Sequence, residues 1–342
     1  MRFKEALTYD DVLLVPQYSD IQSRREIDVG NFLGEGLHLE LPVISSPMDT
    51  VTESDMSVAM HKAGGLGIVH RYNTLAEQVA IVNQIQQNTN FAPIAAAVGV
   101  TGDFEARACA LFDAGVNIVC VDIAHGHHVL MKNALETLRN IFGNEVHLMA
   151  GNVATREGYE DLADWGADSV RCNVGGGSIC STRIQTGHGV PGLQTILDCA
   201  QSDRDAKIIA DGGIKNSGDM VKAFAAGADL VMVGSMLAGT KESPGSIVEE
   251  IDGSKHKLYR GMASKEAQMD WRGEYSSNEG VSTRIPYKGS VVDVLRDVKN
   301  GLASGFSYSG ARNVKQLWVR AEWLRQTSSG LTESRTHILE RY

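Results

Sequence analysis

Residues 207–235, KIIADGGIKNSGDMVKAFAAGADLVMVGS, form one complete strand–helix–strand unit in the sequence pattern. The two ends of this stretch, KIIADGG and DLVMVGS, are short apolar runs, and the segment between them repeats its apolar residues at helical spacing. A glycine in the GAD triplet at 227–229 separates the helix from the second strand, as is usual for helix-to-strand connections. Near-continuous apolar runs are typical of parallel strands that are buried on both faces.

The same unit recurs along the chain. Eight short apolar runs are each followed by a helical pattern or a loop; they lie at 41–48, 65–70, 93–100, 117–124, 146–153, 169–174, 207–213 and 229–235. A doubly wound sheet would rarely need eight consecutive units with such even spacing. The pattern therefore predicts the α/β class and a (β/α)₈ barrel, with residues 1–342 as one catalytic domain.

Composition restricts the possible functions. The 342 residues carry a net charge of −10, which argues against binding to nucleic acid or to an acidic membrane surface. The N-terminus lacks the apolar core of a signal peptide, and no apolar run approaches the ~18 residues needed to span a bilayer. The five cysteines are odd in number and contain no C-x-x-C pair, which favours a reducing compartment. We expect a cytoplasmic protein.

A barrel of this type carries its active site where the strands end. Three of the eight strand exits are rich in glycine, namely 175–177, 211–213 and 234–235. Glycine lets the backbone approach a ligand and turn its N–H groups toward an anion, so these exits predict a phosphorylated small ligand. Each glycine alone is equally compatible with a tight turn.

The most informative loop is 173–189, NVGGGSICSTRIQTGHG. It exposes Cys180 among polar neighbours and places Arg183 close by, which favours a nucleophilic thiolate over a buried structural cysteine. A second loop contains His125, His127 and His128. No carboxylate or cysteine accompanies them at ligand spacing, so we favour a loop role over a zinc site.

Several motifs together resemble the IMP dehydrogenase and GMP reductase family, over about residues 8–315. They are TYDDVLLVP, SSPMDTVTE, DIAHGH, AGNVAT, GGGSICSTR, TGHGVP, ADGGI, VMVGSMLAG, YRGMAS and PYKG. The resemblance implies a barrel that binds a purine nucleoside monophosphate and a nicotinamide cofactor, in which Cys180 attacks C2 of the purine to form a thioimidate. It also implies a potassium ion on this loop, and the expected metal-site residues are Gly175, Gly177, Cys180 and Arg183. The family usually has proline where this chain has Gly176.

The resemblance favours the GMP reductase branch. The expected flap, about residues 252–290, is short: Gly261 and Glu279 are only 18 positions apart. Dehydrogenase flaps carry an adjacent Arg-Tyr pair that helps activate water, whereas here Arg272 and Tyr275 are not adjacent. Residues 274–280 and 307–317 are similar to reductase segments, although Ser276 stands where reductases often have arginine. No regulatory CBS-domain pair fits between the second and third strands.

Roles follow from the resemblance. Cys180, Thr182 and Glu279 are expected to be catalytic, and the Thr-Glu pair is expected to relay a proton. The expected nucleotide contacts are Ser45, Met48, Asn152, Ser178, Asp211, Gly212, Gly213, Gly234, Ser235, Gly261, Met262, Ala263 and Gly280. The expected NADPH contacts are Ser23, Arg24, Arg71, Asp122, Ile123, Ala124 and Tyr275. The family usually forms homotetramers, with cofactor contacts crossing between subunits.

Three alternatives remain open. ISSPMDTVTE, GGLGIVH and VGSMLAGT are dehydrogenase-like, which keeps an IMP dehydrogenase without CBS domains in view. A nucleotide-binding barrel without turnover would retain the ligand contacts alone. The fold by itself is also compatible with a flavin-dependent barrel.

Overall fold

A closed barrel of eight parallel strands forms the centre of the computed structural model, which describes residues 3–89, 93–275 and 278–336. The strands are β4 (Val43–Ser45), β5 (Leu66–Val69), β6 (Ala95–Val98), β7 (Ile118–Asp122), β8 (His147–Val153), β9 (Ser169–Cys172), β10 (Lys207–Asp211) and β11 (Leu230–Val233). Each strand falls within one of the eight predicted apolar runs. The barrel closes between β11 and β4, where Met232 pairs with Ile44. The predicted (β/α)₈ fold is confirmed.

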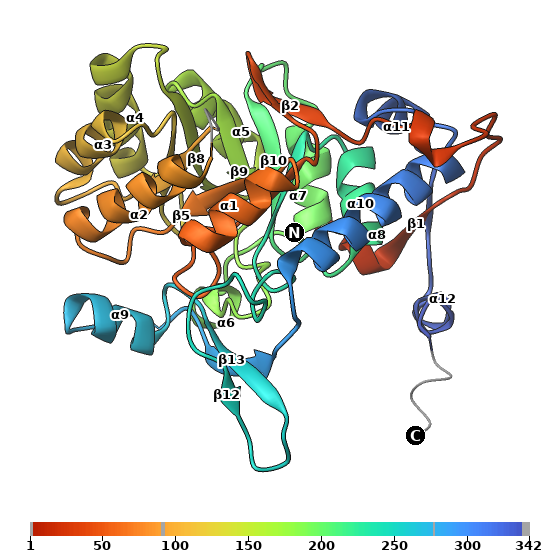
Figure 1. Ribbon diagram of the computed structural model, residues 1–342. Helices are drawn as coiled ribbons and strands as arrows, with labels where there is room; N and C mark the ends of the chain where they lie inside the picture. The colour runs from red at the N-terminus through yellow and green to blue at the C-terminus, as the bar shows by residue number, and fades with distance from the viewer. Residues whose placement is uncertain (1–2, 90–92, 276–277, 337–342) are drawn as a thin grey trace.

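Helices surround the barrel, as Figure 1 shows. They are α1 (Ser54–Lys62), α2 (Leu75–Asn88), α3 (Phe104–Asp113), α4 (Val129–Phe142), α5 (Arg156–Asp164), α7 (Gly192–Cys199), α8 (Ser217–Ala225) and α10 (Val291–Tyr308). Side chains at several helix starts bond the free N–H groups of the first turn. Thr74, for example, accepts from the N–H of Glu77, and Asn216 accepts from that of Asp219.

Two apolar layers stabilise this arrangement. Inside the barrel, alternate strand residues such as Ile68, Met149 and Met232 pack together, while the other face of each strand packs against the helices. The hairpin of β2 (Asn31–Gly34) and β3 (Leu37–Leu39) adds Leu33 and Leu39 to the interior layer. This packing fills the barrel interior.

An arm follows β11. It contains β12 (Val248–Glu249), β13 (Lys255–Arg260), α9 (Lys265–Arg272) and β14 (Ser282–Pro286), and its strands form a three-stranded antiparallel sheet. Figure 1 shows α9 and the β12–β13 hairpin projecting from the same end of the molecule as α6 (Thr182–Thr186). The segment predicted as the flap is therefore folded as strands around a helix.

Two strands from the first and last parts of the chain pair beside the barrel. Strand β1 (Val12–Leu14) pairs antiparallel with β15 (Trp323–Arg325). The remaining short elements are η1 (Tyr9–Asp11), η2 (Arg24–Glu26), α11 (Val314–Arg320) and α12 (Ser328–Glu333).

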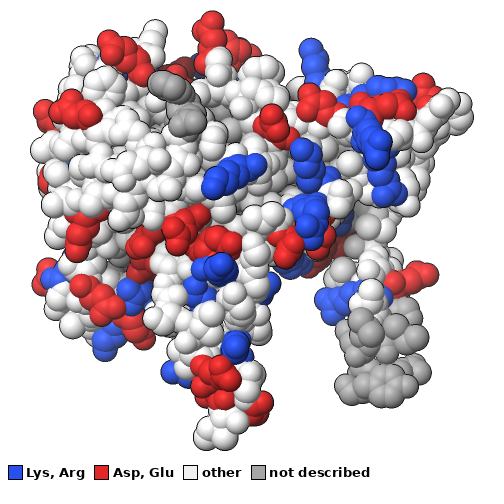
Figure 2. Space-filling view, viewed as in Figure 1, with Lys and Arg blue, Asp and Glu red and all other residues white. Residues whose placement is uncertain are grey.

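Charges of both signs are interspersed among the described residues on the face in Figure 2, without a broad basic area there. Within the described ranges, no helix has the length and apolar character required to cross a bilayer.

Candidate active site

A cavity of about 350 Å³ opens at the carboxyl ends of the barrel strands. The structure brings most of the predicted site residues to its wall: Met48, Arg71, Asp122, Ile123, Ala124, Asn152, Gly175, Gly177, Ser178, Cys180, Thr182, Asp211, Gly212, Gly213, Gly234, Ser235, Gly261, Met262, Ala263 and Glu279. These residues come from seven strand exits and from both ends of the flap.

Six predicted residues do not line this cavity. Ser45 is fully buried on β4 with its hydroxyl bonded to Thr52, and the next residue, Ser46, lines the wall instead because side chains alternate along a strand. Tyr275 is half exposed, and its ring lies 4.7 Å from the Lys265 ammonium. The others are Gly280 and Arg183, which lie behind the wall, and Ser23 and Arg24, which lie at η2 beside α10. Ser276 falls outside the described residues.

The expected nucleophile lies in the loop between β9 and α6. The Cys180 thiol is partly exposed and donates to the Thr182 hydroxyl, with 3.2 Å between Sγ and Oγ1. Thr182 begins α6, so the helix fixes this hydroxyl beside the sulfur. The pair is available to a ligand because both residues line the cavity.

The flap meets this loop directly. Ser181 donates its N–H to the Glu279 carbonyl at 2.9 Å, and Val281 donates to the Ile179 carbonyl at 2.9 Å. Both flap ends must approach closely here: a Cβ added at Gly261 would lie 3.1 Å from the Gly280 Cα. Glycine at these two positions lets the backbone carry Glu279 to the cavity wall.

A buried arginine joins two of the predicted ligand-binding carboxylates. Arg171 on β9 is 7% exposed, and its guanidinium bonds Asp122 at 2.5 Å and Asp211 at 2.9 Å. Burial lowers the pKa of Arg171, but the two carboxylates raise it by more, so it stays well above its usual value. Asp211 also accepts from the Asn152 amide at 2.7 Å. We did not predict Arg171, although a charged residue within the apolar run SVRCNV was a usable signal.

A tyrosine that we did not predict as a site residue lies against the glycine-rich exits. Tyr259 on β13 is buried, and a Cβ added at Gly234 would lie 3.2 Å from its hydroxyl oxygen. Burial raises the pKa of Tyr259, while hydrogen bonds with Ser178 and Ser235 lower it by less. The hydroxyl therefore stays protonated and can donate to an anion at these exits.

Two aromatic rings pack against a cation at the β5 exit of the cavity. Tyr72 stacks on Trp271 of α9 with ring centroids 4.2 Å apart, and the Arg71 guanidinium lies 5.4 Å and 5.6 Å from these two rings. Its nearest carboxylate is Asp122, at 3.7 Å from Nε. Among the described residues, the buried Arg71 Nε has no hydrogen-bond partner, so the guanidinium at the cavity wall keeps a donor that the protein does not use.

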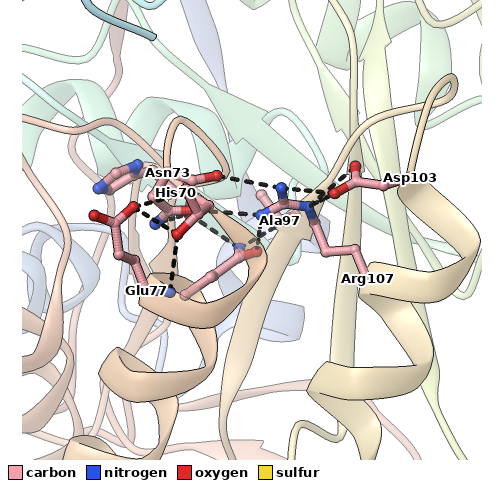
Figure 3. Close-up of polar contacts among 8 residues, drawn as sticks. His70, Asn73, Glu77, Ala97, Asp103 and Arg107 are labelled. Atoms are coloured by element: carbon pink, nitrogen blue, oxygen red, sulfur yellow. Dashed lines mark hydrogen bonds and ion pairs between the residues drawn. The ribbon is translucent and has the colours of Figure 1, made fainter.

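A polar network fixes the loop that carries Arg71. Figure 3 shows Arg107 of α3 reaching Asp103 and the loop residue Asn73. Arg107 also donates to the buried Gln78 side chain at 2.8 Å, and Gln78 donates in turn to the His70 carbonyl at 3.0 Å. The loop after β5 is thus anchored on both sides of Arg71.

The histidine loop lies outside the cavity wall. His128 accepts from the N–H of Leu130 at the start of α4, and His127 bonds Asp161 at 2.7 Å, a carboxylate that is distant in sequence. No group of three or more metal-binding side chains occurs in the described part of the chain.

A family model described as the IMP dehydrogenase / GMP reductase domain matches residues 6–337. The chain belongs to this family. Family members are oxidoreductases that use nicotinamide cofactors. Similar proteins include the inosine-5'-monophosphate dehydrogenase of Cryptosporidium parvum, 36% identical over 98% of this chain and 96% of its own length. The GMP reductase of Leishmania major is 31% identical over 98% of each chain.

A solved structure of a family member supports the fold. A GMP reductase variant from Trypanosoma brucei in complex with guanosine 5'-monophosphate superimposes with a TM-score of 0.92, at 30% identity, and covers 98% of both chains. The alignment with the Leishmania reductase extends over 482 positions against the 342 residues here. A reductase relative thus also carries additional sequence, so a missing insertion does not separate the two branches of the family.

Proposed function

We propose that the protein is a GMP reductase, which converts GMP to IMP and ammonia with NADPH. The observation that carries the proposal is the Cys180–Thr182 pair at the cavity, whose loop is joined by backbone hydrogen bonds to the flap segment that contains Glu279. The proposed reaction needs three groups: the Cys180 nucleophile, the Thr182 hydroxyl beside it and the Glu279 carboxylate on the flap.

The first step is addition of the thiolate. Cys180 adds to C2 of the purine, and the ring nitrogen takes up the electron pair. The thiol proton leaves through the Thr182 hydroxyl, to which the sulfur is already bonded.

The second step expels the 2-amino group. An amine leaves readily only when protonated, so a donor must stand beside the exocyclic nitrogen. Thr182 alone is too weak an acid, and Glu279 on the same cavity wall supplies the proton through it. Loss of ammonia leaves a thioimidate between Cys180 and C2. When bound, the reduced nicotinamide would supply hydride to C2, and Cys180 would leave as the thiolate when the C–S bond breaks to release IMP.

The nucleotide fits the arrangement of the walls. The phosphate would bind at Ser178, Gly213, Gly234 and Ser235, where Tyr259 adds a neutral donor. Asp211, held by Arg171 and Asn152, presents its carboxylate for the ribose hydroxyls. Gly261, Met262 and Ala263 would contact the base.

The β5 exit of the cavity fits an anionic dinucleotide. Arg71 there has an unpartnered buried Nε, and its loop is fixed by the Arg107 network. Arg71 would bind the cofactor phosphates, while Asp122, Ile123 and Ala124 would lie under the nicotinamide. Ser23, Arg24 and Tyr275 lie outside this cavity, so they would contact the cofactor only from a neighbouring subunit of the proposed tetramer.

Potassium remains part of the proposal through the carbonyls of Gly175, Gly177 and Cys180. The Gly177 carbonyl accepts the Cys180 N–H at 3.1 Å and retains a second lone pair for a cation. Arg183 does not offer its side chain, because the guanidinium is a cation without acceptors that donates to the Val174 and Val190 carbonyls.

IMP dehydrogenase is the second candidate. The dehydrogenases from Nitrosopumilus maritimus and Cryptosporidium parvum are 35% and 36% identical to this chain, against 31% for the Leishmania reductases. The flap favours the reductase because it has no adjacent Arg-Tyr pair to activate water.

A paired assay tests the proposal by following the absorbance of the reduced nicotinamide. One reaction contains GMP and NADPH, and the other contains IMP, NAD⁺ and potassium. A falling signal in the first with a flat second supports the reductase, whereas a rising signal in the second shows a dehydrogenase. Cys180→Ala serves as the control, and residual turnover of this variant above background would contradict the thioimidate route.

A further inference from the structure

Asn173 lies at the point where three parts of the site meet. It follows β9 and is 3% exposed. Its amide nitrogen donates to the Gly212 carbonyl at 3.2 Å, and its amide oxygen accepts from Arg183 at 3.2 Å. Its own carbonyl accepts from Asn152 at 3.0 Å. Asn173 therefore links the Gly212 exit, the Arg183 anchor and the ribose-side Asn152.

The Asn173 side chain also occupies the space beside Gly176. A Cβ built at Gly176 would lie 2.1 Å from the Asn173 amide nitrogen and 2.6 Å from its oxygen, and the three nearest atoms all belong to Asn173. No side chain fits there unless Asn173 moves, and movement breaks the hydrogen bonds to Gly212 and Arg183. Asn173 in its hydrogen-bonded position thus leaves room only for glycine at position 176.

Arg183 supports the same loop from beneath. A Cβ at Gly175 would lie 2.5 Å from the Arg183 Cγ, and the guanidinium bonds the Val174 carbonyl at 3.0 Å. The loop between Val174 and Cys180 therefore rests on Arg183 and Asn173. Because Cys180 closes this loop by donating its N–H to the Gly177 carbonyl, displacement at Gly176 moves the thiol.

We propose that Asn173 is a positioning residue that sets the Cys180 loop, and that Asn173 and Gly176 form a matched pair in which the amide takes the volume of the missing side chain. The effect on turnover rests on the proposed function. The effect on the Cys180 thiol does not, because it follows from the loop packing alone.

A double-mutant cycle tests the pair with two readouts. The variants are Gly176→Ala, Asn173→Gly and the double variant. The first readout is the rate at which iodoacetamide alkylates Cys180, measured by mass spectrometry of its peptide so that Cys109 does not contribute. The second is kcat and KM with GMP and NADPH. Melting temperatures identify any variant that fails to fold.

We expect Gly176→Ala to change the alkylation rate and to lower kcat by at least tenfold. In the double variant, the alkylation rate and kcat should both lie within about threefold of their values in the Asn173→Gly variant. A double variant whose alkylation rate and kcat are as altered as those of Gly176→Ala would overturn the matched pair. If Asn173→Gly does not fold, Asn173→Ala replaces it, because alanine removes the amide while keeping the Cβ.

Asn173→Asp separates packing from hydrogen bonding. Aspartate keeps the volume beside Gly176 and the acceptor for Arg183, but it turns an oxygen toward the Gly212 carbonyl. We expect a Cys180 alkylation rate within twofold of wild type and a KM for GMP raised at least fivefold. An alkylation rate as altered as that of Gly176→Ala would contradict the packing argument. If the protein turns over neither GMP nor IMP, the proposed function fails while the alkylation cycle still decides the pair.

Discussion

The backbone of Cys180 pairs with that of Gly280 as an isolated antiparallel bridge. This bridge pairs the segment after α9 with the Cys180 loop, although the two residues are 100 positions apart in sequence, counted from 180 to 280. The position of this segment and that of the thiol are consequently parts of one backbone arrangement.

Gly280→Ala should separate the flap from the loop. The added Cβ would lie 2.9 Å from the Ser264 nitrogen, a backbone atom that cannot move without shifting the start of α9. In steady-state assays with GMP and NADPH, we expect kcat to fall at least tenfold. We expect only a small change in the melting temperature. The neighbouring Val281→Ala, whose side chain is half exposed, is the control and should stay within twofold of wild type. Equal effects of the two substitutions would contradict the close-approach argument.

Arg107→Leu should loosen the loop that presents Arg71. Arg107 is 6% exposed, and its loss would leave the buried Gln78 oxygen and Asn73 without their donor. We expect a loss of about 2–3 kcal/mol in the free energy of unfolding and a higher KM for the cofactor. Chemical denaturation and cofactor titration measure the two effects. Arg156→Ala removes an exposed i,i+4 pair with Glu160 and should cost under about 0.5 kcal/mol.

The barrel was predictable from the sequence because each strand is a short apolar run and each connection carries local turn signals. The glycines and polar residues at the strand exits, which line the cavity, were predictable from the strand ends alone. Arg171 and Tyr259 were missed for a different reason: their partners, Asp122, Asp211 and Ser235, come from other strand exits, and only closure of the barrel brings them together. The β1–β15 pairing joins the two ends of the chain and has no local signal.

Ser45 shows the limit of reading a strand exit without its register. The sequence does not specify whether Ser45 or Ser46 ends the strand on the cavity side, and a shift of one residue reverses the side chain. The structure buries Ser45 against Thr52 and exposes Ser46 to the cavity.

Arg171→Met should destabilise the barrel because it leaves Asp122 and Asp211 without their shared cation. Removing one partner of a buried ion pair typically costs about 3–5 kcal/mol. We expect an effect of this size in chemical denaturation, together with loss of GMP binding in calorimetry. Arg204→Ala removes an exposed pair with Asp164 and serves as the matched control, at under about 1 kcal/mol. A stable variant with unchanged GMP affinity would show that Arg171 does not hold Asp211 in place.

His147 should make the protein acid-sensitive. Burial lowers its pKa to about 4, although Asp168 opposes this shift, and its Nε2 lies 2.8 Å from the Ser169 hydroxyl. Below a pH of about 6.5 the unfolded chain takes up a proton that the folded chain refuses, so stability falls as the pH drops from 6.5 toward 4. The loss is on the order of 3 kcal/mol at most.

His147→Gln cannot titrate, so its unfolding free energy should fall less than that of wild type between pH 7 and 5. If the unfolding free energies of wild type and His147→Gln fall in parallel with pH, His147 is not the cause of the acid sensitivity.

Tyr259→Phe tests where the nucleotide phosphate binds. Because burial keeps the Tyr259 hydroxyl protonated beside Ser178 and Ser235, it can donate to a phosphate at any pH the enzyme tolerates. A hydrogen bond to a charged group contributes about 1.5–3 kcal/mol, so the KM for GMP should rise at least tenfold. We expect kcat and the KM for NADPH to change less than twofold, since Arg71 lies at the β5 exit, two strands away from β11 in the barrel. Tyr308→Phe, at a tyrosine that is 62% exposed, controls for loss of a hydroxyl and should leave all three constants unchanged. A rise in the KM for NADPH instead of GMP would place the two ligands in the reverse order along the cavity, because the only group removed belongs to the glycine-rich exits.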